Sequence, residues 1–215
     1  TWGDTIQISG KNLRASAGEV SVNFGEFPSR VIMSNDSLIA CIVPPEVPDS
    51  AVSVAVKVLN QETISAKAFV FTSPVIKTYT PRASFGETIT LTGSGFSPVV
   101  RENRVHFNEY FAEVLEASRN SLTVVVPPGL NRSASKLSVE VHLRTTYAAD
   151  SFRLSTPVIK SISASSGKRG TTVTIVGEHF SPHLGGNRVF FEDNLAAQQG
   201  ATGSEIRVTV PGGRM

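Results

Sequence analysis

The feature that most constrains the fold of this chain is an internal repeat. Residues 3–10 read Gly-Asp-Thr-Ile-Gln-Ile-Ser-Gly, and closely similar octets occupy residues 86–93 and 170–177. The starting glycines lie 83 and 84 residues apart. Self-similarity at a fixed spacing means that one structural unit recurs along the chain. Any fold assigned to one unit must therefore suit all three.

Further segments match at the same spacing, and they delimit the units. Phe69 corresponds to Phe152, and Pro-Val-Ile-Lys occurs at residues 74–77 and again at 157–160. The segments of the form Val-x-Phe are Val22-Asn23-Phe24, Val105-His106-Phe107 and Val189-Phe190-Phe191. We therefore expect a first repeat at 1–73 that lacks its first strand, a complete second repeat at 74–156, and a third repeat at 157–215 that lacks its last strands. From these incomplete units we expect the chain to be a fragment of a longer protein.

Within each repeat the apolar residues alternate with polar ones, a period typical of strands. Leu137, Val139 and Val141 alternate with polar residues, and in the first repeat Val52, Val54, Val56 and Val58 alternate with Ser53, Ala55 and Lys57. Such alternation buries one face of a strand and exposes the other. The second repeat is predicted to hold strands at about 75–78, 88–92, 104–107, 112–116, 122–126, 136–143 and 148–153. About seven short strands per unit indicate an all-β fold of tandem immunoglobulin-like sandwiches.

Composition excludes several classes of protein. With 40% hydrophobic residues the chain can build packed cores, and no segment approaches the ~18 consecutive apolar residues of a membrane-spanning helix. The net charge is +2 and the cations are spread along the sequence, which argues against a nucleic-acid partner. The single cysteine, Cys41, cannot form an internal disulfide, and its apolar setting predicts a buried side chain.

The repeated motifs resemble one known family. They read Pro-Val-Ile-Lys, then Gly-x-Thr-Val/Ile-Thr-Ile/Leu-x-Gly, then Asn-Arg-Val-x-Phe, then Leu-x-Val-x-Val-Pro. This series resembles the IPT/TIG domain, the immunoglobulin-like fold of plexins, some transcription factors and many surface proteins. Cysteine-poor tandem copies look like those of bacterial cell-surface proteins for polysaccharide use. The resemblance implies an extracellular or outer-surface location and carries no active site.

No residue pattern indicates catalysis or a cofactor. A Gly-x-Ser-x-Gly nucleophile motif does not occur in the sequence. The best metal candidates, Glu178, His179 and His183 with Glu192 and Asp193, fall in turn segments where helical His spacing does not apply. His179 occupies the turn position held by Asn12 and Gly95 in the other repeats. We therefore predict no catalytic residues, no cofactor and no metal.

Four aromatic residues are candidates for ligand contact, because flat rings can stack on sugars. Phe27 and Tyr110 align with each other at the tip of a turn in their repeats. Phe190 takes an outward position between two core residues, and Trp2 lies outside the repeated motif.

The function predicted from the sequence is that of a non-catalytic spacer or binding module in a larger bacterial surface protein that presents a glycan-binding domain. Two alternatives stay open. The repeats could be an adhesion or receptor-type module that binds a protein, or accessory domains of a polysaccharide-degrading enzyme. The expected partners are a polysaccharide or a surface protein and further domains of the same chain. Neither a nucleic acid nor direct membrane insertion of this segment is expected.

Overall fold

The structure, a computed structural model, describes residues 3–13, 17–59 and 61–212. In that part of the chain strands dominate, and the helices are two 3-10 turns, Ala17–Glu19 and Val100–Glu102. The chain divides into two compact units, Thr1–Pro74 with Glu140–Thr145, and Val75–Val139 with Thr146–Met215. The fold class predicted from the sequence, tandem β-sandwich repeats, is confirmed.

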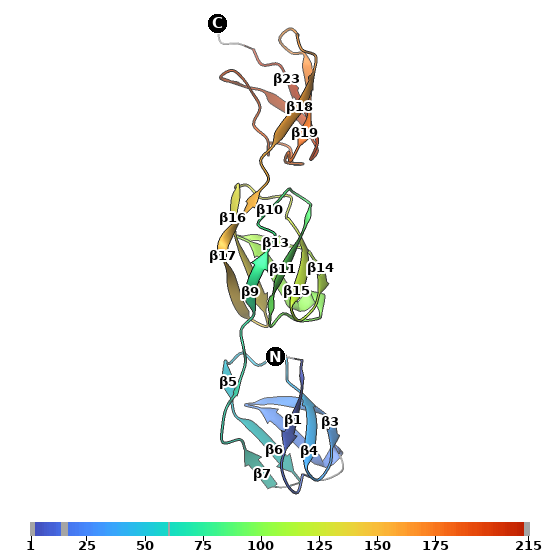
Figure 1. Cartoon of the computed structure of the whole chain (residues 1–215), viewed down its shortest axis with the longest axis vertical. Helices are drawn as coiled ribbons and strands as arrows, with labels where there is room; N and C mark the ends of the chain where they lie inside the picture. Colours follow the sequence, from blue (N-terminus) through green and yellow to red (C-terminus); the bar gives the residue numbers. More distant parts are fainter. Residues whose placement is uncertain (1–2, 14–16, 60, 213–215) are drawn as a thin grey trace. The chain divides into compact units, whose positions relative to one another are not determined.

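The second repeat is a sandwich of two sheets (Figure 1). Its strands are β9 (Val75–Tyr79), β10 (Arg82–Ala83), β11 (Thr88–Ser94), β12 (Asn103–Phe107), β13 (Tyr110–Ala112), β14 (Val114–Ala117), β15 (Ser121–Val125), β16 (Ala134–Val141) and β17 (Arg144–Leu154). One sheet has the order β14-β15-β11-β9 and the other β10-β17-β16-β12-β13. The inward faces of both sheets supply the core of this repeat.

Alternation along the strands fills that core, as the sequence predicts. Val105 and Phe107 on β12 and Leu137 on β16 are fully buried, at 0% exposure. The ring of Phe107 meets that of Phe152 edge to face, with centroids 4.9 Å apart. Edge-to-face packing is the favourable arrangement for aromatic pairs.

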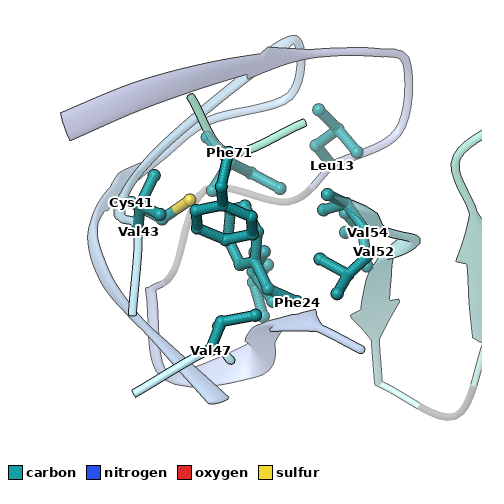
Figure 2. Packing of buried hydrophobic residues seen from close by; sticks show 12 residues of the cluster. Leu13, Phe24, Cys41, Val43, Val47, Val52, Val54 and Phe71 are labelled. Carbon is teal, nitrogen blue, oxygen red and sulfur yellow. The ribbon is translucent and has the colours of Figure 1, made fainter. Parts of the chain in front are cut away.

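The first repeat builds the same core from the matching residues. Its strands are β1 (Thr5–Ser9), β2 (Val20–Phe24), β3 (Phe27–Ser34), β4 (Leu38–Ile42), β5 (Ala51–Val52), β6 (Val54–Val58), β7 (Gln61–Ile64) and β8 (Phe69–Val70). Phe24 meets Phe69 edge to face at 5.1 Å, which repeats the Phe107–Phe152 pair. Figure 2 shows Phe24 and Phe71 inside this core, with Cys41 beside them. Cys41 is fully buried as predicted, and burial raises the pKa of its thiol.

The third repeat forms the same first sheet but a smaller second one. Its strands are β18 (Val158–Ser163), β19 (Thr172–Glu178), β20 (Phe190–Phe191), β21 (Asn194–Leu195), β22 (Ala197–Ala201) and β23 (Glu205–Thr209). The order β18-β19-β23-β22 matches β9-β11-β15-β14, while β20 and β21 pair alone. In the residues that the structure describes, this repeat has no counterpart of β16 and β17. Phe191 is consequently half-buried, whereas Phe24 and Phe107 are at 0% exposure.

Two turns recur in all three repeats, and they explain why glycine or a polar residue stands at the same positions of each repeat. Gly3, Gly86 and Gly170 all have left-handed backbone, with φ of 70°, 76° and 87°. Glycine adopts this conformation without steric cost. The next shared turn places Asn12, Gly95 and His179 at φ of 62°, 75° and 62°. His179 therefore stands at a turn position, as the alignment of the repeats indicates.

Two details of the strand prediction are wrong. The predicted strand at 112–116 divides into β13 and β14, which belong to different sheets. The strand predicted to end at residue 143 ends at Val141, and Leu143 is 76% exposed instead of contributing to the core. His142 and Leu143 form the hairpin turn, with φ of 47° and 64°, so alternation stops before Leu143.

Candidate functional site

The structure shows where three of the four aromatic candidates from the sequence lie within their own repeats. Trp2 lies outside the described residues, and the other three belong to different repeats. Phe27 is half-buried and packs against the core of the first repeat. Tyr110 is half-buried, and its ring lies beside Gly129. Cross-strand pairing explains both positions, because Phe27 lies opposite buried Phe24 and Tyr110 opposite buried Phe107. Directly opposed residues share one face of a sheet.

Phe190 points outward on β20, as the sequence predicts, and is 49% exposed. The guanidinium of Arg188 lies over its ring, 5.3 Å from the centroid. This contact within one segment accounts for the position of both side chains.

The second repeat carries another set of exposed aromatic residues. The first of them follows the predicted Tyr110 directly in sequence. Phe111 on β13 is 67% exposed and lies directly opposite His106 on β12. The two ring centroids are 4.2 Å apart with an interplanar angle of 45°. Since Val105 and Phe107 point into the core, His106 and Phe111 lie on the opposite side of the sheet.

Tyr147 extends this group across the same sheet. It is 58% exposed on β17, and the ammonium of Lys136 on β16 lies 4.3 Å from its ring centroid. Leu137 and Ala148, the chain neighbours of these two residues, are buried in the core. Tyr147 and Lys136 therefore share the outward side with Phe111 and His106. A cation over an aromatic face holds both side chains in place.

Arginines complete this outward side. Arg82 on β10 lies beside Arg153 on β17 in a parallel pairing, and the next pair joins Ala83 to Leu154. Ala83 is buried, so Arg82 and Arg153 point away from the core. By the same alternation Arg104 on β12 points outward. We call the set Arg82, Arg104, His106, Phe111, Lys136, Tyr147 and Arg153 the outer face of the second repeat.

Sequence reasoning missed this outer face because its members come from five strands of one sheet. The arginines and Lys136 look scattered along the chain, and only the strand order brings them to one surface. One signal was nevertheless present. Counting cross-strand pairs from the two-residue turn at Asn108 assigns Tyr110 to the inner side and Phe111 to the outer side.

The described residues hold no group of three or more His, Cys, Asp or Glu side chains that could bind a metal ion. Nor does this part of the chain contain a helix with the length and apolar character required to cross a membrane.

The chain is similar in sequence to fibrocystin-L of two mammals. The chain is 27% identical over 198 residues to fibrocystin-L of Mus musculus, an alignment that covers 87% of the chain and 5% of that protein. For fibrocystin-L of Homo sapiens the identity is 28% over 197 residues, with 85% of the chain and 4% of that protein covered. The chain thus spans a small part of the length of these relatives.

Among solved structures, the chain aligns with plexin A4 and with a bacterial protein. The full extracellular region of plexin A4 aligns with 98% of the chain and 20% of the plexin chain, at 15% identity and a TM-score of 0.43. The surface glycan-binding protein PbSGBP-B from Prevotella bryantii aligns with 70% of the chain and 37% of its own, at 17% identity and a TM-score of 0.37.

The family comparison covers nearly the whole chain. The model of the IPT/TIG domain matches residues 1–73, 74–154 and 157–214. The chain therefore belongs to the IPT/TIG domain family and carries three tandem copies of this non-catalytic, immunoglobulin-like module.

Proposed function

We propose that the chain is a non-catalytic binding and spacing segment of a larger cell-surface protein, and that its ligand is a carbohydrate. The observation that carries the proposal is the pair of exposed rings on the outer face, Phe111 at 67% and Tyr147 at 58% exposure. Large exposed aromatics on one side of a sheet offer stacking surfaces for sugar rings. Polar groups beside them, His106 and Lys136, supply hydrogen bonds to hydroxyl groups.

The arrangement suits binding on a rigid support. Phe111 and Tyr147 stand on strands of one five-stranded sheet whose inner side is packed in the core. Because those strands are held by the core, few degrees of freedom are lost when a ligand binds. The first and third repeats would then act as spacers. The proposal includes an extracellular or outer-surface location.

The test is retention of the whole chain in native gels that contain neutral or acidic polysaccharides. We expect at least one polysaccharide to retard the protein, and the double variant Phe111→Ala/Tyr147→Ala to abolish the retardation. Release of reducing ends should stay at background during long incubation. Retardation unchanged in the double variant, or release of reducing ends by the pure protein, would overturn this assignment.

A second candidate function, contact with a protein, is favoured by one observation on the third repeat. Strand β18 is the edge of its sheet, and Val158, Ile159 and Ile162 are 46%, 64% and 60% exposed. Exposed edge strands with apolar side chains can pair with another chain. Sedimentation equilibrium tests this in its simplest form, association of two copies. Association that Ile159→Lys/Ile162→Lys removes supports the second candidate, and a monomer at all concentrations contradicts the pairing of two copies through β18.

A further inference from the structure

We propose that the outer face of the second repeat binds an acidic polysaccharide, with sugar rings on Phe111 and Tyr147 and uronate carboxylates on the arginines. This inference rests on the proposed carbohydrate binding and names the class of carbohydrate. It follows from the charge of the surface, which the sequence alone does not reveal.

The outer face carries a marked excess of positive charge. Its cations are Arg82, Arg104, Lys136 and Arg153, and each belongs to a strand of the same sheet. Every second residue of β16 points outward, so Glu140 lies on the outer face with Lys136. It is the carboxylate that the described strands place on this side of the sheet. Asp150 on β17 alternates with the outward residues, and its carbonyl oxygen accepts a hydrogen bond from Tyr79. Charge complementarity therefore favours an anionic ligand.

The kind of cation points to carboxylates. Three of the four are arginines, whose planar guanidinium can bind a carboxylate through two parallel hydrogen bonds. Arg82 and Arg153 lie side by side in the parallel pairing of β10 with β17. Arg82 donates to Thr156 Oγ1 at 3.4 Å, a long contact that leaves most of its donors for another partner. Adjacent arginine forks are thus available to one end of the ligand.

The surface is long enough for a polymer. Tyr147 and Arg153 are six residues apart on β17, which at the rise of a strand corresponds to about 20 Å. Phe111 stands three strands away from Tyr147, or about 14 Å at the usual strand spacing. An extended chain of several sugar units can therefore reach both the stacking rings and the arginines.

A single-stranded nucleic acid is the main competing anion, since it also combines stacking with negative charge. Proteins that bind nucleic acids usually have strongly basic domains with pI above about 9. This chain has a net charge of +2 and a pI of about 8.8. The limited net charge of the chain therefore favours an acidic polysaccharide over a nucleic acid.

The experiment measures the affinity of the whole three-repeat chain for polygalacturonate, neutral dextran, dextran sulfate and a single-stranded oligonucleotide. We expect polygalacturonate to bind most tightly and to bind less tightly as salt is raised. Phe111→Ala and Tyr147→Ala should each weaken binding about tenfold, as loss of one stacking contact does elsewhere. Arg153→Gln and Arg82→Gln should weaken polygalacturonate binding and leave the melting temperature unchanged.

The third repeat provides matched controls. Phe190 is an exposed aromatic with Arg188 over its ring, so Phe190→Ala and Arg188→Gln remove the same groups away from the outer face. Both control variants should bind polygalacturonate as the unchanged chain does.

Each other outcome overturns the inference in a recognisable way. Equal affinity for neutral dextran, with no effect of Arg153→Gln, would leave the proposed function standing and refute the acidic class. Equal or tighter binding of dextran sulfate or the oligonucleotide would show general attraction of anions. Absence of binding to every polysaccharide would refute both the inference and the proposed function.

Discussion

At the scale of single residues, neighbouring positions on one strand serve different purposes. On β12, Phe107 is fully buried and meets Phe152 edge to face, whereas His106 meets exposed Phe111 on the other side of the sheet. The sequence predicts this division at Phe107, because the Val-x-Phe segment recurs in all repeats. It does not predict the partner of His106, because that contact depends on the pairing of β12 with β13.

Stability should therefore respond to Phe107 and not to Phe111. Phe107→Ala removes a buried ring and should cost the second repeat about 3–5 kcal/mol, comparable to the stability of a small domain. Phe111→Ala, on the outer face, should change stability by no more than about 0.5 kcal/mol. Hydrogen exchange of amides in β12, β15 and β16 measures both effects. Similar losses in the two variants would show that the assignment of inner and outer faces is wrong.

Glu192 offers a second test at this scale. It is an exposed residue with φ of 52°, at the turn position that Gly25 and Asn108 hold in the other repeats, with φ of 60° and 53°. Residues other than glycine and asparagine rarely adopt this left-handed backbone conformation, because their side chains clash with the backbone. Glu192→Asn should stabilise the third repeat by about 1 kcal/mol. Asp193→Asn makes the same change of charge one residue later and should have little effect on the unfolding curve. A neutral or destabilising Glu192→Asn would contradict the turn assignment.

At the scale of strands and sheets, the sequence predicts the elements well and their ends poorly. The burial alternation in β16 ends at Val141, but the apolar pattern of the sequence continues to Leu143, because nothing in it marks His142 and Leu143 as a turn. The segment at 112–116 is another example, since a strand that changes sheets keeps its alternation. Strand order is the main information that the sequence lacks, and it is strand order that assembles the outer face.

Gly93 tests the pairing of β9 with β11. The register of this pair shifts between Thr92 and Gly93, and a Cβ on Gly93 would overlap the carbonyl oxygen of Val75. Gly93→Ala should force the strands apart and destabilise the second repeat by about 1–3 kcal/mol. At Gly129 a Cβ would make an ordinary contact with Tyr110 at 3.6 Å, so Gly129→Ala should be tolerated. Equal melting temperatures for both variants would refute the close approach of the two strands.

At the scale of the whole molecule, three copies of one sandwich differ in how completely their cores are covered. In the third repeat the buried cluster is Val173, Ile175, Phe180, Ala196, Ile206 and Val208, and Phe191 packs at its margin. The described residues of this repeat have no strands like β16 and β17 to cover Phe191. The repeat pattern of the sequence predicts this difference, because the segments that supply Leu137 and Phe152 have no third copy.

The difference should appear in native-state hydrogen exchange of the three-repeat chain. Less apolar area is removed from water in the third repeat, and burial contributes about 25 cal/mol per Å2. Amides of β19 and β23 should therefore exchange much faster than those of β11 and β15, their counterparts in the second repeat. Equal protection in a monomeric sample would show that the third core is as complete as the second.

The proposed binding places the ligand on the outer side of one sheet of the second repeat. NMR titration of the isotope-labelled three-repeat chain with short oligomers of galacturonic acid locates the ligand residue by residue. We expect shifts for the amides of His106, Phe111, Lys136, Tyr147 and Arg153, with the amides of the first and third repeats unchanged. Shifts confined to residues around Phe27 or Phe190, or an unchanged spectrum at saturating oligomer, would contradict it.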